Sequence, residues 1–296
     1  MLQKAGDAKN KTVEAEGLES IQLAVMASHD DKGINTTSLA KNLSEINGLT
    51  DTDNQSITEI TLPKSVKLNN IKYKIKEDGT VIMNNSILPD EFEQVEYIES
   101  SGTQYINTKY YANGISSYSF KYSNNSINGV MFGAYNGHWT SGNGLYINIT
   151  STDHGNPFLH YYSNSRIPVS YYNEGIIEIN RGTFCLNGVQ YLNLKPTEFN
   201  VQYSTYIFCG NWNGQRKEQF SKYRLYYFRI YEENEQIRFF VPCYSTTTVT
   251  DVDEKQCSVG TVGLYDTVNG QFYTNQGTGT FGYGMEDGTY VAPTNN

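Results

Sequence analysis

The sequence predicts a small α+β unit followed by a larger all-β sandwich, and three observations support this fold class. Tyr73 is the only aromatic residue before Glu91, whereas aromatic residues recur every few positions after it. Upstream of Glu91, apolar residues follow first a helical period and then a period of two. Downstream, the strand period is interrupted by seven Asn-Gly dipeptides, beginning at 113, 128, 136, 143, 187, 213 and 269. Asn and Gly both tolerate positive φ, so each dipeptide favours a tight turn.

The first part of the chain begins with a predicted helix over residues 10–28. Leu18, Ile21 and Val25 lie at i, i+3 and i+7 and form one apolar face, which we expect to pack on the sheet that follows. Glu14 and Glu16 lie on the opposite side and are expected to point outward. We assign residues 1–88 to this α+β unit.

A short helix and a small antiparallel sheet are predicted to follow. Thr36 or Thr37 can cap the short helix, and Asn47-Gly48 ends it. Strands with a period of two are predicted at 57–62, 65–69, 71–75 and 80–83.

The second part, residues 89–284, is predicted to be a two-sheet sandwich, because its strands alternate with turns and show no helical period. We expect the first and last strands, near 95–97 and 280–281, to be neighbours. Residues 285–296 are predicted to be a flexible tail. The other predicted strands are 117–122, 130–135, 145–149, 158–162, 176–179, 205–209, 223–231, 237–241 and 262–265.

Composition limits the classes of partner. The net charge is −9, without long runs of one sign; this disfavours nucleic acid and anionic membrane, because phosphate binding needs a concentrated basic face. The four cysteines form no CxxC pair and no cluster at zinc spacing, so no structural metal is predicted. No apolar stretch is long enough to span a membrane, and the run MLQKAGDAKNK lacks the apolar core of a signal peptide.

Three runs cover about residues 5–85 in order: AGDAKNKTVEAEGLESIQLAVMAS, GINTTSLAKNLSEINGL and LPKSVKLNNIKYKIKEDGTV. Together they resemble the globular part of a Gram-positive type IV pilin, in which a long helix leads into a small antiparallel sheet. Pilins of this family begin with an apolar half-helix that holds the subunit in the membrane and then in the filament core, and this chain lacks it. Either the chain is a soluble fragment that starts after that segment, which we prefer, or the likeness is one of shape without filament assembly.

Four runs over 91–284 carry a second resemblance: VEYIESSGTQYINT, IEINRGTFCLNG, KYRLYYFRIYEENEQIRFFVPCY and VGLYDTVNGQFYTNQGTGTF. They resemble the concanavalin A-like, or laminin-G-like, jelly-roll modules of surface and phage-tail proteins of low-GC Gram-positive bacteria. Family modules usually pass directly from the VPCY strand to the GLYD segment, whereas this chain inserts 245–259, including Cys257. A Cys243–Cys257 disulfide is one alternative for this loop, and a lone core cysteine at Cys243, as relatives carry, is the other.

The jelly-roll likeness includes glycoside hydrolases, which need two carboxylates a few ångströms apart, typically as E-x-D-x-x-E. Glu178 is followed by Asn180 and Arg181 and does not fit this pattern, and the run from Glu232 to Glu235 indicates a solvated turn. The four scattered histidines suggest no Ser-His-Asp or Cys-His arrangement. We therefore predict no catalytic role.

Sugar recognition is better supported, because both tryptophans lie in Gly- and Asn-rich segments that favour exposed loops. An aromatic ring stacks on the apolar face of a pyranose, while amide and charged groups bond its hydroxyls. In the alternative interpretation, each tryptophan is a loop plug that packs over the edge of the sandwich. By likeness to relatives, Asp153 is the candidate ligand for calcium, and no other cofactor is expected. The predicted carbohydrate-binding residues are Trp139, Trp212, Asn143, Asn211, Asn213 and Arg216.

Together these features predict a non-enzymatic, pilin-like subunit on a bacterial cell surface or pilus, which displays a lectin-like jelly roll for adhesion. Its expected partners are other pilin subunits and glycans or glycoproteins of a host or neighbouring cell. It would contact the membrane only through the apolar segment that this chain lacks. Two alternatives stay open: a phage tail or baseplate protein for host attachment, and a structural surface module that binds nothing.

Overall fold

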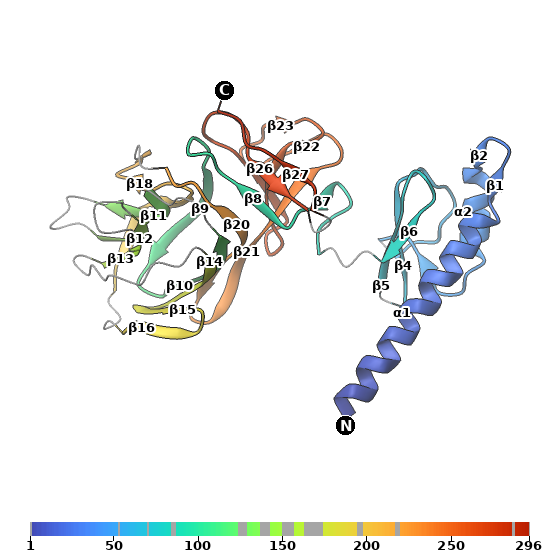
Figure 1. Cartoon of the computed structure of the whole chain (residues 1–296), viewed down its shortest axis with the longest axis horizontal. Coiled ribbons are helices and arrows are strands. Elements are labelled where there is room, and N and C mark those ends of the chain that lie inside the picture. The colour runs from blue at the N-terminus through green and yellow to red at the C-terminus, as the bar shows by residue number, and fades with distance from the viewer. Residues whose placement is uncertain are drawn as a thin grey trace. The chain divides into compact units, whose positions relative to one another are not determined.

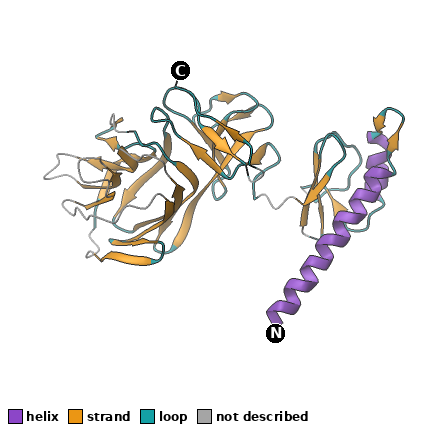
Figure 2. Cartoon of the chain, viewed as in Figure 1, coloured by secondary structure: helices purple, strands orange, loops and turns teal. Residues whose placement is uncertain are grey.

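The computed structural model of the chain consists of two compact units, Met1–Asp90 and Glu91–Asn296. Among the described residues, the helices belong to the small unit and the large unit is built of strands (Figure 1 and Figure 2). The chain is therefore mostly β, with a short helical and β part at its N-terminus, as the sequence predicted. The described residues are 2–52, 54–69, 71–83, 87–123, 129–136, 143–149, 157–162, 174–193, 198–216, 220–285 and 288–295.

The small unit contains two described helices and a four-stranded antiparallel sheet in the order β3-β4-β5-β6. A separate hairpin, β1 with β2, follows the first helix. The elements are α1 (Leu2–Met26), β1 (His29–Asp30), β2 (Gly33–Ile34), α2 (Thr36–Ser44), β3 (Leu49–Thr50), β4 (Lys64–Leu68), β5 (Ile71–Ile75) and β6 (Val81–Met83).

One face of α1 packs into the core of the small unit. Ile21 and Val25 are buried there, and Leu18 packs half-buried beside them, together with residues of α2 and the sheet. This confirms the apolar face predicted from the helical period. Glu16 is exposed as expected, whereas Glu14 is half-buried. The helix begins at Leu2, earlier than predicted, and its first turns extend past the small sheet (Figure 1).

Gly17 sets how closely α1 approaches β5. A Cβ atom at this position would lie 2.2 Å from the Tyr73 hydroxyl oxygen, so glycine leaves the room that the ring needs. The Tyr73 hydroxyl donates to the carbonyl oxygen of Glu14 at 3.1 Å. Burial raises the pKa of this phenol, and the nearby Glu14 carboxylate adds to the effect. One contact thus joins the helix to an interior strand of the sheet.

Two local expectations for the small unit are corrected. Asn35, and not Thr36 or Thr37, caps α2: its side chain accepts a hydrogen bond from the Ser38 backbone N–H at 3.0 Å. The segment 57–62 forms no strand. It contributes buried isoleucines to the core instead, and its backbone is not paired with the sheet.

The large unit contains two main sheets, antiparallel except where β11 pairs parallel with β18. The larger sheet has twelve described strands: β7 (Phe92–Gln94), β8 (Tyr97–Glu99), β10 (Ser116–Ser123), β14 (Glu174–Asn180), β15 (Thr183–Leu186), β16 (Val189–Asn193), β20 (Arg224–Glu232), β21 (Glu235–Ser245), β24 (Val262–Asp266), β25 (Gln271–Thr274), β26 (Gly282–Gly284) and β27 (Tyr290–Val291). The smaller sheet has seven described strands: β9 (Ile106–Asn113), β11 (Gly129–Asn136), β12 (Asn143–Ile149), β13 (Pro157–Tyr162), β17 (Asn200–Ile207), β18 (Asn211–Trp212) and β19 (Gln215–Arg216). A short pair, β22 (Val249–Thr250) with β23 (Gln256–Cys257), stands apart from both.

The two sheets pack face to face over an aromatic core. Phe132 of β11 contacts Tyr118, Phe120 and Phe228 of the larger sheet, with ring centroids 5.1, 5.3 and 5.1 Å apart. All four rings are buried. Tyr118 and Phe120 are two positions apart on β10, so they point to the same side of the sheet. The alternating aromatic residues of the sequence therefore form the interior of the large unit.

Strands near the two ends of the large unit meet in the larger sheet. β8 pairs with β26, which confirms that the strands near its two ends are neighbours. The sequence predicted a flexible tail over 285–296, whereas β27 instead pairs with β26. The Gln104 side-chain amide also donates to the carbonyl oxygen of Thr294 at 2.6 Å, which holds the segment that follows β27.

Cys243 and Cys257 are not bridged by a disulfide. Cys243 is buried in β21, and burial raises the pKa of its thiol. The inserted segment 245–259 carries the β22–β23 pair, and its Val252 N–H donates to the carbonyl oxygen of Phe272 at 2.8 Å. The insertion therefore covers part of the edge of β25.

Candidate functional site

The strand ends around the predicted glycan-binding residues come together at one end of the smaller sheet. Asn136 ends β11 and Asn143 begins β12, and these two residues are paired. On the other side of β11, Tyr135 is paired with Trp212 of β18. The strand ends that flank 137–142 therefore lie at the same end of the sheet as Trp212. Asn143 itself belongs to a strand, and the tight turn predicted there does not form.

Trp212 stacks on the buried ring of Tyr135. The ring centroids are 4.5 Å apart and the ring planes are inclined by 29°. Trp212 is half-buried and, with Val130, forms a small apolar cluster separate from the main core. The Asn213 backbone N–H donates to the Tyr135 carbonyl oxygen at 3.0 Å, which fixes the hairpin against β11. The indole is thus supported on one face by the buried Tyr135 ring.

Asn213 and Gly214 form the tight turn between β18 and β19. Both have positive φ, 51° and 79°, as the Asn-Gly pattern predicted. The turn packs on Tyr203, because a Cβ atom on Gly214 would lie 2.8 Å from that ring. Asn213 is exposed, as its predicted role requires. Arg216, at the end of the hairpin, pairs with Asn211.

Asn211 faces the interior, which does not fit the predicted ligand contact. Its side chain is buried, and its amide nitrogen donates to the carbonyl oxygen of Ser204 at 2.8 Å. That bond joins the hairpin to β17. We therefore assign Asn211 a structural role, in place of contact with a sugar.

Several predicted site residues cannot be placed in this arrangement. Trp139 and Asp153 lie outside the described residues, and for Asn143 and Arg216 only the backbone is described. Their predicted roles stay predictions. Within the described ranges, no group of three or more His, Cys, Asp and Glu side chains is arranged to hold a metal ion.

Glu232, considered above for catalysis, has a structural environment and does not lie in a solvated turn. It is half-buried and accepts hydrogen bonds from the Tyr110 hydroxyl and the Asn113 side-chain amide, both at 3.0 Å. The turn itself is made by Glu233 and Asn234, whose φ angles are 48° and 73°. The hydrogen bonds of Glu232 therefore join the end of β9 to the end of β20.

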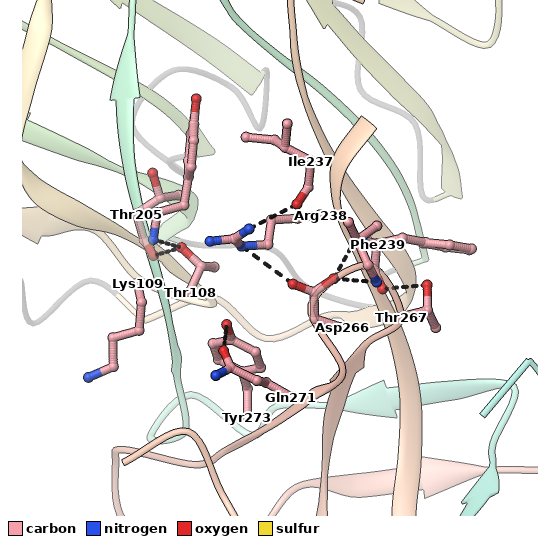
Figure 3. Close-up of polar contacts among 12 residues, drawn as sticks. Thr108, Lys109, Thr205, Ile237, Arg238, Phe239, Asp266, Thr267, Gln271 and Tyr273 are labelled. Atoms are coloured by element: carbon pink, nitrogen blue, oxygen red, sulfur yellow. Dashed lines mark hydrogen bonds and ion pairs between the residues drawn. The ribbon is translucent and has the colours of Figure 1, made fainter. Parts of the chain in front are cut away.

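Asp266 is the centre of a buried polar cluster between β21 and β24 (Figure 3). It is wholly buried, and its Oδ1 accepts hydrogen bonds from the backbone N–H groups of Phe239 and Val268 at 3.0 and 3.1 Å. Its Oδ2 lies 3.4 Å from Arg238 Nε. Two backbone amides thus bond one oxygen of this carboxylate, and a guanidinium forms an ion pair with the other. These contacts stabilise the turn after β24.

Two cavities in the described part of the large unit lie away from the predicted site. The larger, of about 560 Å³, is lined by the inserted segment 245–259 and by residues between β25 and β27. The smaller, of about 250 Å³, lies beside Arg224 and the end of the chain. Their linings come from segments far apart in the sequence. In the sequence, only the insertion at 245–259 pointed to the place of the larger cavity. No motif indicated the smaller cavity.

No protein-family model matches the chain, and neither a curated protein nor a solved structure matches it. Among the described helices, none is both long and apolar enough to cross a membrane. Function is therefore inferred from the residues and their geometry.

Proposed function

We propose that the large unit is a concanavalin A-like jelly roll that binds glycans. Two packed sheets around a shared aromatic core support this fold assignment. The observation that carries the binding role is the half-buried Trp212 ring, stacked on Tyr135 at the end of the smaller sheet. An indole held in this way offers a preformed surface to the apolar face of a sugar ring. Asn213, exposed beside it, would bond a sugar hydroxyl.

The proposal also makes the small unit a pilin-like assembly unit. A long helix packed by one face on a four-stranded antiparallel sheet supports this assignment. The first turns of α1 extend past the small sheet and would contact other pilin subunits (Figure 1). The chain would then act outside the cell, on a bacterial surface or pilus, and display the large unit for adhesion.

The proposed role is non-enzymatic. A hydrolase needs carboxylates that reach its substrate. Glu232 and Asp266 instead accept hydrogen bonds from groups of their own fold. These two carboxylates therefore serve the stability of the large unit.

The experiment that tests the proposed function is a glycan array probed with the full chain. We expect saturable binding to a restricted set of glycans, and competition by the free sugar. Failure to bind any glycan would contradict the lectin role and favour the structural surface module. Detection of the chain on phage tails, and not on pili, by immunogold electron microscopy would favour the phage alternative.

A further inference from the structure

The smaller cavity, which we call the Arg224 cavity, has a construction suited to a small charged ligand. It lies where β8, the start of β20 and the C-terminal segment meet, and its walls include Glu99, Ser101, Ser123, Lys222, Arg224 and Tyr290. Its volume of about 250 Å³ is below the roughly 300–1,000 Å³ of sites for drug-sized ligands. The cavity therefore suits one sugar ring better than a chain of them.

Arg224 is anchored on one side of the cavity and retains donors. Its Nε donates to Glu99 Oε2 at 2.9 Å, across the pairing of β20 with β8. The guanidinium lies 4.5 Å from the centroid of the Tyr97 ring and 5.6 Å from that of Tyr290. A guanidinium has five N–H donors, so the Glu99 bond leaves others for a ligand. These contacts fix the position of the cation before any ligand arrives.

Lys222 gives the cavity an excess of positive charge. Its stem lies over Gly102, where a Cβ atom would be 2.9 Å from Lys222 Cε, and the residue is exposed. In the described part of the chain, no carboxylate forms an ion pair with its ammonium. Glu99 balances Arg224, so Lys222 leaves a net charge of about +1 at a cavity of a protein whose net charge is −9. That surplus matches a single carboxylate.

Tyr290 provides an aromatic wall. Its side chain is 48 % exposed although β27 is held by pairing with β26. The Ser123 hydroxyl, bonded to the Tyr226 hydroxyl at 3.1 Å, adds a polar group able to bond a sugar hydroxyl. A purely structural role for the Arg224–Glu99 pair accounts for the joining of β8 to β20. It leaves the cavity and the uncompensated Lys222 without a role.

We propose that the Arg224 cavity binds an acidic monosaccharide unit such as a uronic acid. The carboxylate would lie between the Lys222 ammonium and the remaining Arg224 donors, and the apolar face of the sugar would lie against Tyr290. This inference rests on the proposed glycan-binding function of the large unit and adds a second site, distinct from Trp212.

The test is calorimetric titration of the full chain with galacturonic acid and, as the matched neutral sugar, galactose. We expect galacturonic acid to bind at least about tenfold more tightly than galactose, and raised salt to weaken it. Lys222→Gln and Tyr290→Ala should each reduce the affinity for galacturonic acid about tenfold. Lys255→Gln removes an exposed lysine elsewhere in the same unit and should change nothing. Lys222 and Tyr290 are both exposed, so the variants should keep the wild-type melting temperature.

Equal binding of the two sugars, or unchanged affinity in Lys222→Gln, would overturn the proposal. Inorganic phosphate that binds more tightly than galacturonic acid would also overturn it, in favour of a phosphate site. Trp212→Ala separates this inference from the proposed Trp212 site. It should leave galacturonic acid binding unchanged, and loss of that binding would place the sugar at Trp212 instead. If galacturonic acid binds but the array gives no glycan whose binding depends on Trp212, the result would reject the Trp212 site alone.

Discussion

At the scale of single residues, the contact of Gly17 with Tyr73 determines how α1 lies on the small sheet. Glycine is a poor helix former, and its replacement by alanine in an exposed helix normally stabilises by about 1 kcal/mol. Here the missing side chain has a positive role, because the Tyr73 hydroxyl occupies the place of a Cβ atom and bonds the Glu14 carbonyl oxygen.

We therefore expect Gly17→Ala to destabilise the small unit by about 1–3 kcal/mol, the usual cost of overpacking. The measurement is urea unfolding of the full chain followed by helical circular dichroism, since the described helices belong to the small unit. Tyr73→Phe alone should cost about 1 kcal/mol for the lost hydrogen bond. In the Tyr73→Phe background, Gly17→Ala should cost less than in the wild type, because the atom nearest the added Cβ is gone. A stabilising Gly17→Ala would contradict this account.

At the scale of elements, burial on one helix face decides stability. Ile21 is completely buried in the core of the small unit, whereas Leu23, on the same helix, is 58 % exposed. We expect Ile21→Asp to unfold the small unit, at a cost of about 4 kcal/mol or more for an unpaired charge in the core. Leu23→Asp is the matched control and should stay within about 0.5 kcal/mol of the wild type. Loss of helical signal in both variants, or in neither, would show that this face is not the packing face.

The buried carboxylate of Asp266 gives a second test at this scale. Asp266→Ala leaves two backbone N–H groups without their acceptor and the Arg238 guanidinium without its ion-pair partner, so we expect a loss of about 3–5 kcal/mol in the unfolding free energy of the large unit. Asp266→Asn keeps an acceptor oxygen and should lose distinctly less. Equal losses in the two variants, measured by urea unfolding, would indicate that the charge and not the hydrogen bonds dominates.

Strands whose apolar residues alternate strictly could be predicted from the sequence. The predictions at 117–122 and 223–231 correspond to β10 and β20, which bury alternate side chains against the opposite sheet. The continuous apolar run at 130–135 corresponds to β11, which is buried at nearly every position. The structure of the segment 57–62 could not be predicted in this way. Ile57 and Ile60 are both buried, and their spacing of three fits neither face of a strand. Its burial depends on the tertiary fold, which a local pattern does not encode.

The candidate site was predictable only in part. A tryptophan next to an Asn-Gly turn could be expected near the surface, and Trp212 is half-buried beside the Asn213–Gly214 turn. Its support by Tyr135 depends on a parallel pairing between segments far apart in the chain. The inward side chain of Asn211 depends on the same pairing, because alternation along a two-residue strand cannot be read without its partner.

At the scale of the whole molecule, the many buried tyrosines predict sensitivity to alkali. Burial raises the pKa of Tyr118 and of Tyr223 above the ordinary phenol value of about 10. The unfolded chain loses these protons at lower pH than the folded chain, so their contribution to stability is fully present below about pH 10 and falls as pH rises above it. We expect tyrosinate absorbance and loss of β-sheet circular dichroism to appear together above pH 10. Full tyrosine titration with the sheet signal intact would contradict the buried positions.

Binding of a glycan by the large unit is the central claim for the molecule as a whole, and Trp212 is the residue on which it depends. The rim at the end of the smaller sheet would present the ring to ligands, while Tyr135 behind it stays buried. Removal of a stacking aromatic from a small site costs about 1–3 kcal/mol, which corresponds to roughly tenfold to a hundredfold in affinity.

The most direct measurement is calorimetric titration of the array-selected glycan into the full chain, with Trp212→Phe and Trp212→Ala as variants. Trp212→Ala should weaken binding about tenfold to a hundredfold, and Trp212→Phe should weaken it less, because it keeps most of the apolar face. Melting temperatures of all three proteins would exclude unfolding as the cause. Wild-type affinity in a folded Trp212→Ala variant would contradict the proposed site and leave the indole as a plug over the end of the sheet.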